Sequence, residues 1–220
     1  MAAADGEGDA GGRKPSFFGR YFMGFCDRAV LLTYIGIVSA VVGMSMAFTG
    51  GLLWSLICLI VCGVCDMTDG TVARSCGWRT EEERAFGMQM DSLADALSFV
   101  ALPVAISFGM GHTDPVSIAV CAFYVLTGLV RLGFFNVRAS RSEISYYTGL
   151  PVTTVALVFP FLWLAHLYLD AGLTAAIYDV IMFLMAVLFI SRIRMEKPGR
   201  AFYLGFAVAA AVGIVILLCL

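Results

Sequence analysis

Four aspartates lie in two short motifs within otherwise apolar parts of the chain. The first pair is Asp66 and Asp69, three residues apart, and the second pair is Asp91 and Asp95, four residues apart. On a helix, either spacing places the two carboxylates of a pair on one face. A charged carboxylate at the centre of a membrane costs roughly 2.5–3.5 kcal/mol even on the lenient insertion scale, so four of them indicate a functional site.

The two pairs are predicted to face each other from neighbouring antiparallel helices. Counted inward from Arg74, the first pair lies five and eight residues deep, and counted inward from Gly87, the second pair lies four and eight residues deep. Facing carboxylates repel each other unless cations neutralise them, and hard divalent cations prefer oxygen ligands and phosphate. The spacing therefore predicts a pair of metal ions that holds a pyrophosphate.

Small and basic residues accompany both motifs. Gly70 and Ala73 follow the first pair and Gly87 precedes the second, so little side-chain bulk separates a substrate from the helix backbone there. Arg74 adds a guanidinium whose fixed fork of N–H groups suits a phosphate. These residues predict a phosphate-containing ligand beside the metal ions.

The elements that must position these motifs are membrane helices. The 220 residues are 60% hydrophobic and 14% charged, whereas soluble domains are roughly 25% charged. No charged side chain occurs from residue 29 to residue 65. Breaks at glycine, proline and charged segments predict an all-α, polytopic bundle of seven membrane-crossing helices. Their approximate ranges are 29–49, 52–74, 87–109, 116–137, 151–169, 173–191 and 201–220.

The N-terminal residues are expected to stay outside this bundle. Residues 1–15 are mainly Gly, Ala, Asp and Glu and predict a disordered tail rather than a signal peptide. Residues 16–28 place aromatic side chains at helical spacing beside Arg20 and Arg28, which predicts an amphipathic helix in the membrane interface. The transmembrane catalytic domain is then residues 29–220.

The basic residues predict the orientation. With a cytoplasmic N-terminus, all 14 Lys and Arg residues fall in cytoplasmic segments or at the helix ends beside them. This asymmetry follows the positive-inside rule. The aspartate motifs then face the cytoplasm from a multi-pass integral membrane protein, and we expect no nucleic-acid partner.

The two motifs together resemble a known signature. Their eight defining positions match that of the CDP-alcohol phosphatidyltransferase family, namely Asp66-x-x-Asp69-Gly70-x-x-Ala73-Arg74, twelve residues, then Gly87-x-x-x-Asp91-x-x-x-Asp95. The resemblance implies a homodimer with a six-helix core, so the seventh, C-terminal helix is an addition. It also implies two Mg²⁺ or Mn²⁺ ions that bind the pyrophosphate of a CDP-linked lipid such as CDP-diacylglycerol.

The resemblance also implies a role for each motif residue. Asp66, Asp69, Asp91 and Asp95 would be metal ligands, and Asp95 would in addition be the general base that takes the proton of the acceptor alcohol. The residues that line the nucleotide would be Gly70, Ala73, Arg74 and Gly87.

A second region bears on the acceptor. The segments 131–136 and 147–151 resemble the phosphatidylserine synthase branch of the family, which implies L-serine as the acceptor, with Arg131 and Asn136 in its binding site. Alternatively, Arg131 is an ordinary residue of the membrane interface, whose charged end reaches water. Glycerol 3-phosphate and an inositol phosphate remain alternatives, because Arg131, Arg138 and Arg141 could bind a phosphate.

Two other classes of protein match the sequence motifs less well. Membrane prenyltransferases also hold metal ions against a lipid pyrophosphate, but their two motifs lie far apart in sequence and lack the Gly-x-x-Ala-Arg continuation. A cation transporter would need polar residues across the whole membrane. The segments 54–61 and 99–106, in the outer halves of the two motif-bearing helices, are instead almost wholly apolar.

Overall fold

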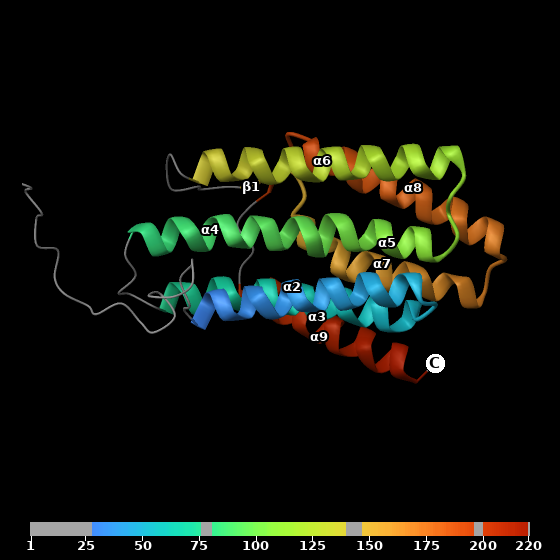
Figure 1. Ribbon diagram of the computed structural model, residues 1–220, viewed down its shortest axis with the longest axis horizontal. Helices are drawn as coiled ribbons and strands as arrows, with labels where there is room; N and C mark the ends of the chain where they lie inside the picture. Colours follow the sequence, from blue (N-terminus) through green and yellow to red (C-terminus); the bar gives the residue numbers. More distant parts are fainter. Residues whose placement is uncertain (1–27, 76–80, 140–146, 196–199, 220) are drawn as a thin grey trace, which may run out of the picture.

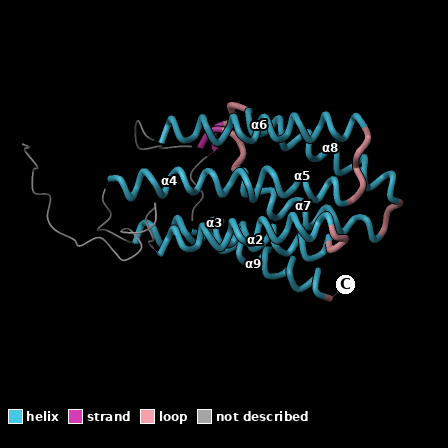
Figure 2. The backbone as a smooth tube through the Cα atoms, viewed as in Figure 1, coloured by secondary structure: helices cyan, strands magenta, loops and turns pink. Residues whose placement is uncertain are grey.

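Apolar stretches of the chain form helices that run side by side along the long axis of the molecule (Figure 1). The structure, a computed structural model, describes residues 28–75, 81–139, 147–195 and 200–219. The α-helices in chain order are α2 (Arg28–Phe48), α3 (Leu52–Ser75), α4 (Glu81–Asp95), α5 (Leu102–Gly109), α6 (Pro115–Ala139), α7 (Val155–Trp163), α8 (Ala171–Ile190) and α9 (Arg200–Leu218). Figure 2 shows how little of the described chain lies outside helices.

The elements between these helices are short. A π-helical turn, Ala96–Ala101, joins α4 and α5 into one continuous rod. Short 3-10 helices, Val152–Thr154 and Leu164–Leu167, flank α7. Two strands of two residues each, β1 (Tyr147–Thr148) and β2 (Arg194–Met195), pair antiparallel and connect the segment before α7 to the segment after α8.

The predicted fold class, an all-α polytopic membrane bundle, is confirmed. Within the described residues, five helical segments are long and apolar enough to cross a membrane: Val30–Phe48, Leu52–Asp69, Glu81–Gly109, Pro115–Arg138 and Gly172–Ile190. Val152–Trp163 is a shorter apolar helical segment, and Gly205–Leu218 is the apolar part of α9, which spans Arg200–Leu218. The chain is therefore an integral membrane protein.

Two predicted helix boundaries differ from the structure. The helix predicted from residue 87 begins at Glu81, because Glu81, Glu82 and Glu83 in its first turn interact favourably with the helix dipole. The helix predicted over 151–169 is α-helical only from Val155 to Trp163 and continues as 3-10 helix. Pro160 inside this helix lacks the N–H needed for one helical hydrogen bond.

The rod of α4 and α5 lies between two groups of helices (Figure 1). The first group contains α2, α3 and α9, and the second contains α6 and α8. Two glycines allow close packing on the rod. An added Cβ on Gly128 of α6 would lie 2.9 Å from Cγ2 of Val100, and one on Gly43 of α2 would lie 3.0 Å from Cδ1 of Leu102. Helices therefore approach the rod too closely for any larger side chain at these positions.

Polar residues stabilise the end of the bundle opposite the aspartate motifs. Asp114 caps α6 by accepting hydrogen bonds from the backbone N–H groups of Val116 and Ser117, at 2.9 and 3.2 Å. The Ser117 hydroxyl lies within hydrogen-bond distance of Asp114 and of Asp179 on α8. Hydrogen bonds from the hydroxyl and N–H of Ser117 hold the pKa of Asp114 below its usual value.

The predicted N-terminal tail and interfacial helix, residues 1–15 and 16–28, lie outside the described residues except for Arg28. Arg28 is the first residue of α2. The proposed extent of the transmembrane domain, residues 29–220, therefore remains a prediction.

Candidate metal centre

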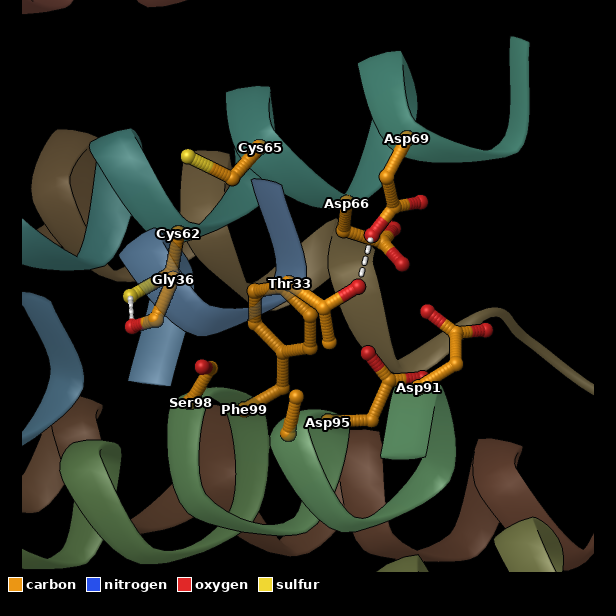
Figure 3. A pocket seen from close by; sticks show the side chains of 11 residues that line it. Thr33, Gly36, Cys62, Cys65, Asp66, Asp69, Asp91, Asp95, Ser98 and Phe99 are labelled. Carbon is orange, nitrogen blue, oxygen red and sulfur yellow. Dashed lines mark hydrogen bonds between the residues drawn. The ribbon is translucent and has the colours of Figure 1, made fainter. Parts of the chain in front are cut away.

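The two aspartate pairs lie on facing surfaces of α3 and α4. Asp66 and Asp69 lie near the C-terminal end of α3, and Asp91 and Asp95 lie in the last turns of α4, just before the π-helical turn. Figure 3 shows the side chains of the two pairs pointing toward one another across the gap between the helices. The spacings of three and four residues place both members of each pair on the facing side.

Three of the four carboxylates form a compact cluster of oxygen atoms. One carboxylate oxygen from each of Asp66, Asp91 and Asp95 lies within 4.8 Å of the others, and all three residues are half-buried. A site made only of carboxylate oxygens suits a hard divalent cation such as Mg²⁺, Mn²⁺ or Ca²⁺ and disfavours metal ions that prefer thiolate or imidazole ligands. The cluster could thus hold a divalent metal ion, whose positive charge would offset the repulsion between the carboxylates.

Asp69 lies beside this cluster and is held by a neighbouring helix. It is buried, with 6% of its surface exposed. The Thr33 hydroxyl of α2 donates a hydrogen bond of 3.0 Å to Oδ2 of Asp69 (Figure 3). This contact restricts the rotamer of the carboxylate.

The four aspartates line one end of a small pocket (Figure 3). Small and weakly polar residues line its deeper wall: Gly36, Cys62, Cys65, Ala94, Ser98 and Phe99. The Cys62 thiol donates a hydrogen bond to the Gly36 carbonyl oxygen at 3.3 Å and so contributes to packing between α2 and α3. The pocket therefore has an anionic part formed by four carboxylates and a deeper, mostly apolar wall.

The predicted acceptor residues both approach the rod from α6. Arg131 is buried, with 9% of its surface exposed, and interacts electrostatically with Asp95. Asn136 accepts a hydrogen bond of 2.8 Å from the Ser92 hydroxyl of α4. A cation and an amide from α6 thus lie on the side of the bundle that carries Asp91 and Asp95.

The structure describes the predicted nucleotide-binding residues only in part. Gly70, Ala73 and Arg74 lie in the C-terminal turns of α3, where only the helical backbone is described. Gly87 lies one turn before Asp91 on α4 and is not among the described residues that line the pocket. A role for these four residues in nucleotide binding remains a prediction.

Three features of the site were not predicted from the sequence: Thr33, Ser92 and the deeper wall of the pocket. Thr33 lies 36 residues before Asp69, so only the pairing of α2 with α3 reveals the contact. Ser92 is 44 residues from Asn136. Ser98 and Phe99 follow Asp95 at helical spacing of three and four residues, and this periodicity is the signal that could have placed them in the pocket.

The fold and the site together define a polytopic membrane protein with a cluster of carboxylates that could hold a divalent cation. Residues 28–193 match the model of one family, described as CDP-alcohol phosphatidyltransferase. This match covers well over half of the chain, and the chain belongs to the CDP-alcohol phosphatidyltransferase family.

Several curated proteins are similar in sequence. The CDP-diacylglycerol–serine O-phosphatidyltransferase of Saccharomyces cerevisiae is 39% identical over 108 residues, which cover 45% of this chain and 38% of the yeast protein. The archaetidylserine synthase of Methanothermobacter thermautotrophicus is 30% identical over 168 residues, or 76% of this chain and 68% of that protein. The CDP-diacylglycerol–serine O-phosphatidyltransferase of Methanocaldococcus jannaschii is 30% identical over 164 residues, or 74% of this chain and 73% of that protein.

Proposed function

We propose that this enzyme transfers the phosphatidyl group of CDP-diacylglycerol to the hydroxyl of L-serine and releases CMP, in a reaction that needs divalent metal ions. The observation that carries the proposal is the cluster of carboxylate oxygens from Asp66, Asp91 and Asp95 inside a membrane bundle. Family membership supports the CDP-linked donor. The names of the yeast and M. jannaschii relatives support serine as the acceptor.

Asp66, Asp69, Asp91 and Asp95 would hold two ions, Mg²⁺ or Mn²⁺, between α3 and α4. When bound, such ions neutralise the pyrophosphate and stabilise the negative charge that develops on the leaving CMP. The residues themselves set the position of the donor, because the carboxylates of two antiparallel helices meet only at matching depth in the membrane. Gly70, Ala73, Arg74 and Gly87 would line the nucleotide, with the Arg74 guanidinium binding phosphate.

The chemical step is an in-line substitution at phosphorus. The serine hydroxyl oxygen forms a bond to the lipid-side phosphorus, and the bond from that phosphorus to the bridging oxygen breaks. The bridging oxygen leaves with CMP, and Asp95 takes the hydroxyl proton as general base. Asp95 suits this role, because its carboxylate lies both in the oxygen cluster and near Arg131, which would bind the serine carboxylate.

The membrane orientation and the assembly are part of the proposal. Basic residues flank the helix ends nearest the aspartate motifs, including Arg74, Arg84 and Arg138, so the positive-inside rule supports a site that faces the cytoplasm. CDP and serine would then enter from water while the acyl chains remain in the lipid. The resemblance to the family supports a homodimer, which the mass of the purified protein in detergent would test.

Arg131 is expected to be required for serine as the acceptor. Arg131→Ala should raise the KM for serine by about tenfold or more, because a hydrogen bond to a charged group contributes roughly 1.5–3 kcal/mol. Arg138→Ala, a change of the same kind seven residues later on α6, is the matched control and should leave the KM nearly unchanged. The measurement is phosphatidylserine formation over a range of serine concentrations.

A phosphorylated acceptor is the alternative. Glycerol 3-phosphate or an inositol phosphate carries close to two negative charges and would recruit a second cation such as Arg138 or Arg141. If the parent protein prefers glycerol 3-phosphate in a competition with serine, the assignment of the acceptor is wrong. If serine transfer is unaffected in Arg131→Ala, the proposed carboxylate contact is wrong.

Thr33 is expected to support metal binding through Asp69. Thr33→Val keeps the shape of the side chain but removes the hydrogen bond to Oδ2, so Mn²⁺ should bind about tenfold more weakly. Thr33→Ser, which retains the hydroxyl, should restore most of the affinity. Ser39→Ala on the same helix removes a hydroxyl that donates to the Cys58 carbonyl and serves as a control. Parent-like Mn²⁺ affinity in Thr33→Val would show that the contact does not position Asp69.

A further inference from the structure

In the rod formed by α4 and α5, a proline interrupts the backbone hydrogen bonding shortly after the aspartate pair of α4. In a regular α-helix the carbonyl of Phe99 would accept a hydrogen bond from the N–H of residue 103. Residue 103 is a proline and has no N–H. The chain forms the π-helical turn Ala96–Ala101 here, and the N–H of Leu102 bonds to the carbonyl of Leu97, five residues earlier.

The hydroxyl of Tyr124 on α6 takes the place of the missing N–H. It donates a hydrogen bond of 2.6 Å to the Phe99 carbonyl oxygen. Tyr124 is fully buried, and its ring packs against Phe159 and Phe189, with ring centroids 6.2 and 5.4 Å away. This buried hydrogen bond ties the π-helical turn to α6.

The π-helical turn, called the wide turn below, sets the direction in which the aspartates of α4 point relative to α5, the half of the rod beyond the turn. Each residue of an α-helix turns the chain by about 100°, and a π-helical turn contains about one residue more, so the two sides of the turn are offset by a similar angle. Beyond the turn, Leu102 packs against Gly43 of α2, and within the turn Val100 packs against Gly128 of α6. Asp91, Asp95, Ser98 and Phe99 then point into the pocket together (Figure 3).

We propose that Tyr124 is a positioning residue for the metal centre: its hydroxyl holds the wide turn that directs Asp91 and Asp95 toward Asp66. This inference rests on the proposed function, since it assigns to Tyr124 an effect on metal binding at the same carboxylates. Tyr124 does not line the pocket, and it acts only through the backbone of the rod.

The test compares two tyrosines whose hydroxyls contact backbone carbonyls of the rod, Tyr124 on α6 and Tyr178 on α8. Tyr124→Phe removes the hydroxyl that contacts the wide turn. Tyr178→Phe is the matched control, because Tyr178 is equally buried and its hydroxyl contacts the Pro103 carbonyl at 3.4 Å, beyond the turn. Mn²⁺ binding to the full-length protein in detergent is measured without substrate, from the electron paramagnetic resonance signal of free Mn²⁺. Thermal unfolding of each variant is measured in parallel.

Tyr124→Phe is expected to bind Mn²⁺ about five- to tenfold more weakly than the parent, and the Mn²⁺ concentration for half-maximal CMP release should rise by the same factor. Tyr178→Phe should bind Mn²⁺ like the parent. Parent-like binding in Tyr124→Phe, or an equal loss in both variants, would overturn the inference. Absence of Mn²⁺ binding by the parent would instead overturn the metal centre itself, and the inference with it.

A second variant covers the case in which Tyr124→Phe does not fold. This variant combines Tyr124→Phe with Pro103→Ala. The N–H of residue 103 can then donate a hydrogen bond to the Phe99 carbonyl, which restores stability to the folded protein. The π-helical turn should at the same time close to a regular α-helix. Mn²⁺ binding in this double variant should remain at least about fivefold weaker than in the parent. Parent-like binding would overturn the inference.

Discussion

Replacement of Asp66, Asp69 or Asp91 by asparagine, one at a time, is expected to abolish CMP release. Each change removes a charged oxygen ligand from a shared site, and the stabilisation that bound metal ions give to the transition state is worth several kcal/mol. At 1.36 kcal/mol for each factor of ten, the loss of rate should be on the order of 10³ or more. The measurement is CMP release from CDP-diacylglycerol and serine at saturating Mn²⁺ or Mg²⁺.

Folding should survive these substitutions. Removing one negative charge from a cluster of repelling carboxylates does not leave an unpaired charge behind, so the metal-free protein should unfold at a similar or higher temperature. Asp170→Asn is a matched control, because Asp170 caps α8 at the opposite end of the bundle and asparagine caps helices about as well. Near-normal turnover in any of the three site variants would remove the metal-site hypothesis.

Asp95→Asn is expected to separate binding from chemistry. If Asp95 is the general base, this variant should still bind CDP-diacylglycerol measurably while the transfer rate falls by roughly 10²–10⁴. Its carboxylate belongs to the oxygen cluster, so some loss of Mn²⁺ affinity is expected as well. The measurements are equilibrium binding of CDP-diacylglycerol and single-turnover formation of phosphatidylserine at saturating metal.

The comparison with Asp91→Asn decides the role of Asp95. Asp91 is four residues earlier on the same face of α4. Because its proposed role is that of a metal ligand only, its substitution should weaken metal-dependent donor binding and turnover together. If donor binding and turnover also fall together in Asp95→Asn, Asp95 is a metal ligand and another group accepts the proton.

The arrangement of the aspartates was predictable because it depends on helical periodicity and depth. Spacings of three and four residues put each pair on one face, and the matching depths of the pairs follow from two adjacent antiparallel helices. The charge-free segment from residue 29 to residue 65 likewise predicts membrane helices without any tertiary information.

Other features depend on tertiary contacts that periodicity does not encode. The hydrogen bond from Thr33 to Asp69 exists because α2 packs against α3, and Tyr124 reaches the Phe99 carbonyl because α6 lies beside the rod. Pro103 indicates an irregular helix, but the sequence does not reveal that the helix widens into a π-helical turn. The early end of α7 at Trp163 was also missed, since an apolar stretch predicts the same span whether its turns are α or 3-10.

The most direct test of the central claim is to identify the lipid product. The purified full-length protein is stripped of metal with a chelator and then incubated with CDP-diacylglycerol and a panel of serine, glycerol 3-phosphate and an inositol phosphate, with and without Mn²⁺ or Mg²⁺. We predict phosphatidylserine and an equal amount of CMP, only when a divalent metal ion is present. Preference for another acceptor, or undiminished turnover after complete removal of metal, would contradict the account.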